Sequence, residues 1–268
     1  MRVSAAERTM NYLMLALFAL FALWPMVSIV ATSLGPRIGE APGLHLDNFV
    51  EAWSIGGFST SLWHSVVVAL IVVTVAATLS IAAGYAFGTM RFRGSGVLFY
   101  LCLLGLMIPA EAVVIPLFFD LRTLGLTDTF AAVALPQIAQ SIAFGTFWMR
   151  AQFRAMPFSL VEAAALDGAG PVRTLTRILA PASMTGIATL LVLVFMWTWN
   201  EFLIPLVMVT AESLRTAPLG LAFFQGQYTQ GFTLLAAGAC IVATPVVLLY
   251  VFLQRHFIAG MLEGAVRE

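Results

Sequence analysis

The sequence predicts an all-α integral membrane protein with six transmembrane helices, and three observations support that fold class. Hydrophobic residues make up 61% of the 268 positions, charged residues only 10%, and the mean hydropathy is +0.97. Six apolar segments are long enough to cross a bilayer core, which takes about 20 residues. The arginines gather in alternate connecting segments. Since a soluble domain carries roughly a quarter charged residues, most of this chain must lie in lipid or against other apolar helices.

The six predicted spans form a single transmembrane domain over residues 1–268. The first follows Arg2 and Arg8. Its uncharged run is too long for the core of a signal peptide, so we expect it to be retained. The spans are placed at about 10–32, 62–87, 96–119, 131–149, 182–209 and 232–253.

Arginine placement predicts the orientation of these spans. With a cytoplasmic N-terminus, ten arginines fall on the inner side, and only Arg37, Arg122 and Arg215 fall on the outer side. Positive charge concentrates in the cytoplasmic loops of membrane proteins, so we expect both termini to be cytoplasmic. The longest inward loop then runs from Arg150 to Pro181.

Several classes of function are disfavoured by composition. The formal net charge is zero, which gives no electrostatic reason to expect nucleic acid as a partner. Cys102 and Cys240 lie inside apolar runs, and the three histidines are far apart, so we expect no disulfide framework and no metal site. The chain has no lysine with which to complete a nucleotide-binding loop. Its energy must therefore come from an ion gradient or from another subunit, and we expect no cofactor on this chain.

The inward segment from Met156 to Pro181 predicts two short helices. Residues 162–166 favour a helix, and Gly168 stands where a left-handed C-terminal cap is usual. Pro171 suits the start of a second helix, which we expect Pro181 to end. Such a hairpin has no catalytic residues, but its exposed edges and small residues allow close approach by a soluble partner.

This loop resembles the EAA loop of inner-membrane permease subunits of ATP-binding-cassette (ABC) importers. The residues that match are Glu162, Ala163, Ala164, Asp167, Gly168, Ala169, Ile178 and Pro181. Ala180 and Thr185 depart mildly from the pattern, which usually has Leu and a second Pro there. The resemblance implies the type I ABC importer permease fold, in which the loop is a cytoplasmic coupling hairpin that docks on an ATPase subunit. A generic amphipathic surface hairpin is the alternative.

Further motifs are similar to those of carbohydrate-importer permeases related to the second maltose permease subunit. They are Met107-Ile108-Pro109, Ile115-Pro116, Leu124-Gly125-Leu126, Trp199-Asn200-Glu201-Phe202, Gln254-Arg255-His256-Phe257 and Gly264-Ala265-Val266. This resemblance implies a bacterial inner-membrane complex with a homologous second permease and two ATPase subunits, which bind the ATP and Mg. It also implies an extracytoplasmic binding protein that delivers a sugar or oligosaccharide. The tail Leu253–Glu268 either touches the ATPases, as in the family, or is disordered.

Polar residues inside the spans are candidates for a substrate path. The candidates are Trp197, Asn200, Glu201 and Glu111. A carboxylate at membrane depth is costly unless it faces a cavity, a partner or water. On a continuous helix, Trp197, Asn200, Glu201 and Ile204 share one face, and Pro205 predicts an opening after Glu201. An aromatic ring beside amide and carboxylate groups suits a sugar, and packing against the second permease is the alternative.

Other polar and small residues in the spans have a more structural interpretation. Glu111 lies between Pro109 and Pro116, so we expect the third span to be broken, with this carboxylate structural or in an outer vestibule. Gln137 and Gln140 either line the path or join neighbouring helices, and we favour the second. We expect the glycines at 84, 88, 145 and 238 to allow close helix packing.

Three other functions remain open. A proton-driven secondary transporter would use Glu111 and Glu201 as relays. An intramembrane enzyme would need a nucleophile–base pair or a metal cluster, neither of which is visible in the sequence. An importer of glycerol-3-phosphate or another small polar solute is the third. Because all arginines lie outside the predicted spans, we favour a neutral sugar, carried by a transport subunit with no enzymatic activity of its own.

Overall fold

The computed structural model describes residues 4–222 and 232–265, and every regular element in those ranges is helical. The chain divides into two compact units, one of Met1–Ser59 with Gly220–Pro245 and one of Thr60–Leu219 with Val246–Glu268. Four helices are long and apolar enough to cross a membrane. They are α1 (Ala5–Ser33), α3 (Phe58–Thr89), α6 (Phe130–Arg154) and α14 (Phe232–Ala265). The all-α membrane fold class predicted from composition is confirmed.

Two further pairs of apolar helices are bent. Helix α4 (Ser95–Met107) meets α5 (Ala110–Thr123) at 98°, and the segment Pro171–Ala182 meets α10 (Met184–Asn200) at 84°. Among the described residues the membrane-crossing elements number six if each bent pair counts as one span. The predicted break in the third span is confirmed and lies at Ile108–Pro109, because Pro109 has no N–H with which to continue α4.

In the first unit, the short helix α2 (Asp47–Ile55) is fixed to the end of α1 by one buried side chain. The Nδ2 group of Asn48 donates hydrogen bonds to the carbonyls of Ser33 and Gly35, both at 2.9 Å. These carbonyls lie at the C-terminal end of α1, where helical partners are missing. Asn48 therefore satisfies two orphan acceptors and sets where the chain turns.

The loop between α1 and α2 is organised around Arg37. Its guanidinium pairs with Glu40 at 2.7 Å, with Asp47 at 2.9 Å and with Glu51. Hydrogen bonds from the side chain and backbone of Arg37 hold the pKa of the Glu40 carboxyl below its usual range. Glu40, His45 and Asp47 are close enough to share a cation, but both carboxylates are already paired with Arg37. We therefore assign no metal role to this loop.

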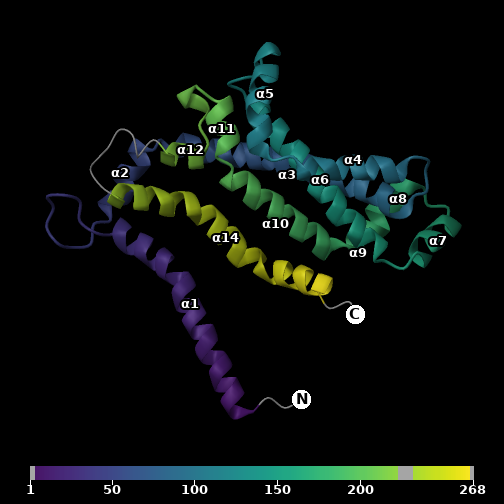
Figure 1. Cartoon of the computed structure of the whole chain (residues 1–268), viewed down its shortest axis with the longest axis horizontal. Helices are drawn as coiled ribbons and strands as arrows, with labels where there is room; N and C mark the ends of the chain where they lie inside the picture. The colour runs from purple at the N-terminus through teal and green to yellow at the C-terminus, as the bar shows by residue number, and fades with distance from the viewer. Residues whose placement is uncertain (1–3, 223–231, 266–268) are drawn as a thin grey trace. The chain divides into compact units, whose positions relative to one another are not determined.

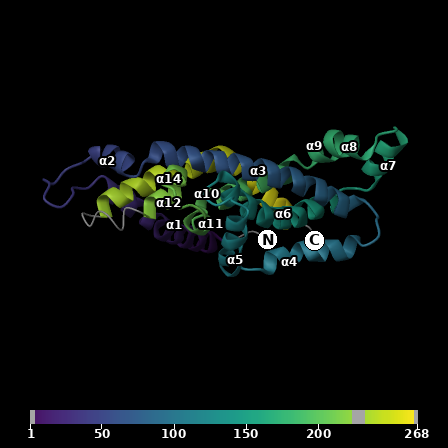
Figure 2. The ribbon, with the colours of Figure 1, turned by 90° about the horizontal axis from the view of Figure 1, so that it is seen from above.

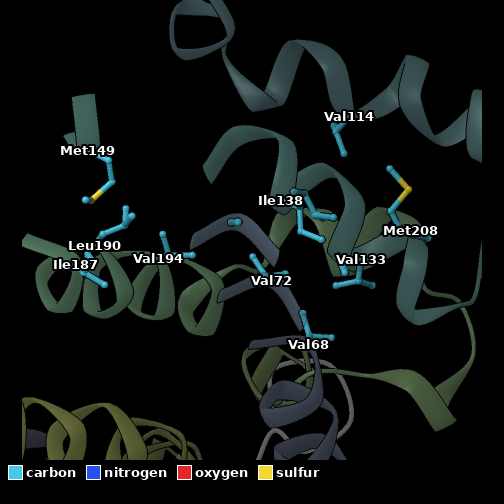
Figure 3. Packing of buried hydrophobic residues seen from close by; sticks show 14 of the residues in the cluster. Val68, Val72, Val114, Val133, Ile138, Met149, Ile187, Leu190, Val194 and Met208 are labelled. Carbon is cyan, nitrogen blue, oxygen red and sulfur yellow. The ribbon is translucent and has the colours of Figure 1, made fainter. Parts of the chain in front are cut away.

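The core of the second unit lies where α3, α6 and α10 pack together (Figure 3). Its buried side chains include Val68, Val72, Val133, Ile138, Leu190 and Val194. Small residues bring the helix backbones close. A Cβ added to Gly84 of α3 would lie 2.5 Å from the Cβ of Met149 on α6.

The other glycines singled out from the sequence also lie at close contacts. A Cβ at Gly145 would overlap the Ser80 side chain, and one at Gly88 would lie 3.2 Å from the Phe153 Cβ. In the first unit, a Cβ at Gly238 would lie 2.9 Å from Leu221. The predicted role of these glycines in close packing is confirmed.

Asp128 joins the turn before α6 to the segment that follows α11 (Leu203–Met208). Its Oδ1 accepts from the N–H groups of Thr210 and Ala211, at 2.6 and 2.8 Å, and its Oδ2 accepts from the Thr210 hydroxyl at 2.7 Å. The backbone N–H of Asp128 donates to Met208 at 3.1 Å. These bonds hold the pKa of the Asp128 carboxyl below its usual range. Asp128 also has a positive φ of 56°, which Asp tolerates better than most residues.

The inward loop begins later than predicted. Helix α6 continues through Arg150 to Arg154, so five residues assigned to the loop are helical. The Arg150 guanidinium lies 3.8 Å from the ring centroid of Phe99, and its Nε donates to the Phe87 carbonyl at 3.3 Å. The charge is thus accommodated by an aromatic face and a carbonyl, and the helix need not end before it.

The hairpin beyond α6 consists of α7 (Ser159–Leu166), α8 (Pro171–Thr174), a π-helical turn (Leu175–Leu179) and α9 (Ala180–Ala182). Figure 2 shows α7 to α9 together at one end of α6. The predicted end of the helix at Pro181 is wrong, since the helix continues to Ala182. Pro181 lies directly after the π-helical turn, in a stretch that stays helical on both sides of it.

Helix α14 extends past the predicted sixth span to Ala265. The alternative of a disordered tail from Leu253 is therefore wrong as far as Ala265. The last three residues, 266–268, lie outside the described part of the chain, as do residues 223–231 between the fifth and sixth predicted spans.

Candidate functional site

Two interruptions of helical backbone lie close together in the second unit (Figure 1). The first is the bend between α4 and α5, where Ile108 adopts an extended conformation with ψ of 116°. The second lies between α10 and α11, where Glu201 is extended with ψ of 123°. Pro205 follows Glu201 by four residues and has no N–H to donate to its carbonyl, so the predicted opening is confirmed. Broken backbone at membrane depth is tolerated only inside protein or beside a water-filled cavity.

The side chain of Glu201 satisfies part of the backbone that the helix break leaves unpaired. Its Oε1 accepts a hydrogen bond from the N–H of Ile204 at 3.0 Å, which satisfies one free donor in the first turn of α11. Within the described residues its other carboxylate oxygen forms no hydrogen bond.

The expectation that Ile204 shares an open face with Trp197 and Asn200 is wrong. The break turns α11 away from the line of α10, and Ile204 is only 2% exposed, whereas Trp197 and Asn200 are exposed. Helical spacing therefore relates Trp197 to Asn200 and Glu201, but not to the residue beyond the break.

A pocket of about 540 Å³ lies between the two breaks. This volume is in the range of small-molecule sites in proteins, about 300–1,000 Å³. Its polar residues are Gln137, Gln140, Ser141, Thr198, Asn200 and Glu201. The remaining lining is Gly105, Leu106, Ile108, Ala110, Phe144, Leu193, Met196 and Trp197. No basic residue lines it, so the pocket offers hydrogen-bonding groups and apolar surface without positive charge.

A row of aromatic rings fixes the orientation of Trp197. The rings of Phe144 and Trp197 meet edge to face, with centroids 4.7 Å apart, and Phe144 stacks on Trp148. The Nε1 group of Trp148 donates to the carbonyl of Gly186 on α10 at 2.8 Å. Trp197 therefore presents a positioned, half-exposed ring to the pocket.

The pocket gathers most of the path candidates read from the sequence, but not all. Trp197, Asn200 and Glu201 line it, whereas Glu111 is exposed in the first turn of α5 and only its neighbour Ala110 reaches the pocket. Gln137 and Gln140 both line it, although helix joining was the favoured interpretation.

Sequence reasoning missed Ser141 and Phe144 as lining residues. Together with Gln137 they follow the i, i+4, i+7 spacing of one helix face, and that spacing was the available signal. This spacing did not distinguish a pocket lining from a packed face, because a helix face with only three or four polar or aromatic residues is also typical of helix packing.

The hairpin holds the EAA-like residues in a fixed arrangement. Gly168 has a φ of +72°, and the N–H of Ala169 donates to the Ala164 carbonyl at 2.9 Å, which closes the end of α7. Glu162, Ala163, Asp167 and Gly168 are exposed.

Three of the EAA-like residues are less exposed. Ala164 is buried, and Ala169 and Ile178 are half-buried, so all three contact the rest of this chain. Two apolar side chains of the hairpin point outward, since Leu166 is 89% exposed and Val172 is 75% exposed.

Comparison with known proteins decides the family. The family described as "Binding-protein-dependent transport system inner membrane component" matches residues 80–262, more than half of the chain. The chain belongs to this family. Its members are inner-membrane transport components, which agrees with the apolar spans and with the resemblance inferred from the hairpin.

Three curated relatives of this permease family are similar over nearly their whole length. The arabinooligosaccharides transport system permease protein AraQ of Halalkalibacterium halodurans is 32% identical over 94% of both chains. The trehalose transport system permease protein SugB of Mycobacterium tuberculosis is 31% identical, covering 92% of this chain and 93% of the relative. The sn-glycerol-3-phosphate transport system permease protein UgpE of Yersinia pestis is 32% identical, covering 94% and 95%.

Solved structures support the same fold. The permease resembles a chain from the crystal structure of a bacterial ABC transporter that imports the acidic polysaccharide alginate, with a TM-score of 0.79 and 22% identity. That match covers 96% of this chain and 99% of the other. The type I ABC importer permease fold implied by the sequence is thereby confirmed.

Proposed function

We propose that this permease carries a neutral sugar or oligosaccharide through the membrane as one subunit of an ATP-driven importer. The pocket between the two helix breaks carries the proposal. It combines a positioned indole ring with amide, hydroxyl and carboxylate groups, and sugars present C–H faces and hydroxyls to such a set.

The absence of basic residues from the pocket lining favours a neutral solute over an anionic one. A phosphate group at membrane depth needs positive charge or many N–H donors to replace its hydration. Glu201 adds negative charge instead. The curated relatives include both sugar permeases and a glycerol-3-phosphate permease, so glycerol-3-phosphate is the second candidate substrate.

The hairpin between α6 and α10 is the proposed contact with an ATPase subunit. Glu162, Asp167 and Gly168 are exposed beside the outward side chains of Leu166 and Val172, and this mixture suits docking in a cleft. The partner ATPases would bind ATP and Mg, and this chain needs no cofactor for that role. Closure of the ATPases would move the hairpin and shift the spans between inward-facing and outward-facing states.

The rest of the proposed assembly follows from the same orientation. Both termini and the hairpin face the cytoplasm, and the pocket opens toward an extracytoplasmic binding protein that delivers the sugar. A homologous second permease completes the path. The end of α14 reaches the ATPases, as the family resemblance implies.

Uptake by the reconstituted importer tests this proposal. Proteoliposomes that contain this chain with its second permease, ATPases and binding protein are supplied with trehalose, arabinotriose or glycerol-3-phosphate. We expect ATP-dependent accumulation of at least one neutral sugar and none of glycerol-3-phosphate. ATP-dependent accumulation of glycerol-3-phosphate alone would overturn the assignment of a neutral substrate.

A further inference from the structure

We propose that this chain itself holds one ring of the transported sugar, with a sugar hydroxyl donating to Gln137 Oε1 and a C–H face lying on Trp197. The inference rests on the proposed function and deepens it. It assigns substrate contact to this subunit's own residues, rather than leaving recognition to the second permease and the binding protein.

Gln137 lines the pocket and carries an oxygen without a hydrogen-bond partner among the described residues. Gln137 is only 4% exposed, and its Nε2 donates to the Val133 carbonyl at 2.9 Å, which fixes the orientation of the amide. Its Oε1 has no hydrogen-bond partner within the part of the chain that the structure describes. A buried carbonyl oxygen without a partner is unfavourable, so a ligand that brings an O–H group is favoured there.

Four other buried side-chain oxygens in the described ranges also have no hydrogen-bond partner, but their residues do not line the pocket. They belong to Asn48, Ser80, Thr146 and Thr216. Of the five described residues that carry such an oxygen, only Gln137 lines this pocket. An acceptor without a partner on a residue that lines a pocket points to a ligand. The other four unpartnered oxygens supply matched controls.

The chemistry of this acceptor selects a hydroxyl. A carbonyl oxygen can only accept, so its partner must carry a proton on oxygen or nitrogen. Sugar hydroxyls meet that need. Glycerol-3-phosphate also carries hydroxyls, but its phosphate group has no proton to donate when fully ionised, and the free carboxylate oxygen of Glu201 would repel that charge.

The second observation is the positioned ring of Trp197. It is 48% exposed, it is held edge to face by Phe144, and the row ends at the hydrogen bond from Trp148 to Gly186. A ring that is fixed before binding loses little entropy when a ligand stacks on it. Gln137 on α6 and Trp197 on α10 line the same pocket, so one ligand placed there is shared between the two helices.

Protection of a cysteine from labelling measures binding in the pocket directly. Gln140→Cys places a thiol on the pocket lining, in a chain with Cys102→Ala and Cys240→Ala. The assembled importer is treated with a maleimide over a range of trehalose or arabinotriose concentrations. We expect the transported sugar to protect the thiol and glycerol-3-phosphate to give no protection.

Two substitutions in that background test the named contacts. Gln137→Leu removes the acceptor, and Trp197→Ala removes the ring. We expect each to weaken protection about tenfold, as expected for one lost hydrogen bond or stacking contact. Trp197→Phe should restore much of the protection. Thermal stability of Gln137→Leu should stay level or rise, because an unsatisfied buried oxygen has been removed.

Thr146→Val is the matched control. It also removes a buried, unpartnered oxygen from α6, but Thr146 does not line the pocket. We expect the control to leave sugar protection unchanged. An equal loss in Thr146→Val would show that the effect is structural and would overturn the proposal.

The outcomes separate this inference from the proposed function. If a neutral sugar is transported with ATP but gives no protection, or if Gln137→Leu and Trp197→Ala protect as well as the parent, the pocket contact is wrong and the proposed function stands. If no neutral sugar is transported and glycerol-3-phosphate is, both are wrong.

Discussion

At the scale of single residues, Glu201 shows how a costly carboxylate can be kept at membrane depth. Its Oε1 caps the N–H of Ile204, so the side chain stabilises the restart of the helix that Pro205 interrupts. The same residue lines the pocket. Glu201 therefore both caps the backbone at the break and lines the pocket.

The capping role predicts a difference between two variants of Glu201. Glu201→Gln keeps an oxygen at the end of the side chain and should retain the stability of the parent. Glu201→Leu leaves the Ile204 N–H without its partner and should lose about 1 kcal/mol. Thermal unfolding of the purified complex measures the difference. Equal stability of the two variants would show that the cap contributes nothing.

Some of the pocket residues were predictable from the sequence, and others were not. Trp197, Asn200 and Glu201 were found because they stand together in a span where polar residues are rare. The unpartnered oxygen of Gln137 was not predictable, because it depends on which carbonyl the amide reaches. Ile204 was misplaced because helical spacing was continued through a break.

At the scale of elements, the contact of α3 with α6 depends on small residues. A Cβ at Gly84 would approach both the Met149 side chain and the Arg150 backbone, the latter at 2.9 Å. Backbone cannot move aside as easily as the end of a flexible side chain, so the two helices would have to separate.

Gly84→Ala is therefore expected to destabilise the protein by about 1–3 kcal/mol, the usual cost of overpacking. Gly96→Ala is the matched control, since it lies inside α4 with open space around the new Cβ. The control should be neutral or slightly stabilising, because Ala favours a helix more than Gly does. Chemical or thermal unfolding of both variants compares them, and equal stability would contradict the close contact.

The Asp128 junction predicts a pH dependence. Hydrogen bonds from the Ala211 backbone and from Thr210 lower the pKa of Asp128 in the folded state below its unfolded value of about 3.9. Its stabilising contribution is present above that unfolded value and is lost as the pH falls through the lower folded pKa.

Asp128→Asn removes the titrating group and keeps a residue that tolerates a positive φ. The parent should be more stable than the variant at neutral pH, and the gap in Tm should narrow as the pH falls below about 4. A gap that stays constant across this range would mean that the charge of Asp128 does not matter.

The hairpin predicts a coupling defect at Gly168. Its φ of +72° is costly for residues with a Cβ, by roughly 1–2 kcal/mol, while the space around it is open. Gly168→Val should therefore disturb the hairpin through backbone conformation. We expect more ATP hydrolysed per sugar transported, or loss of the ATPase from the purified complex.

Gly168→Asn is the control for that prediction, since Asn tolerates the left-handed region. It should transport nearly as well as the parent. Normal transport by Gly168→Val would remove the support for a rigid hairpin that couples the two subunits.

At the scale of the whole molecule, apolar composition and arginine placement predicted the fold class, because spans must be long and apolar. The two-helix hairpin was also predictable from Gly168 and Pro171, which have strong local conformational preferences. The bends of 98° and 84° were not, since a proline indicates a break but not its angle. The continuation of α6 past Arg150 was not predictable either, since the contact of Arg150 with Phe99 joins residues distant in sequence.

We infer that this permease takes its energy from ATPase subunits through the hairpin and not from an ion gradient. Sugar uptake by the complete importer in proteoliposomes, with and without a protonophore, tests it most directly when the partner ATPases are either active or carry an inactivating substitution. We expect uptake that requires active ATPases and is unchanged by the protonophore. Uptake that persists without ATP hydrolysis and collapses with the proton gradient would contradict it.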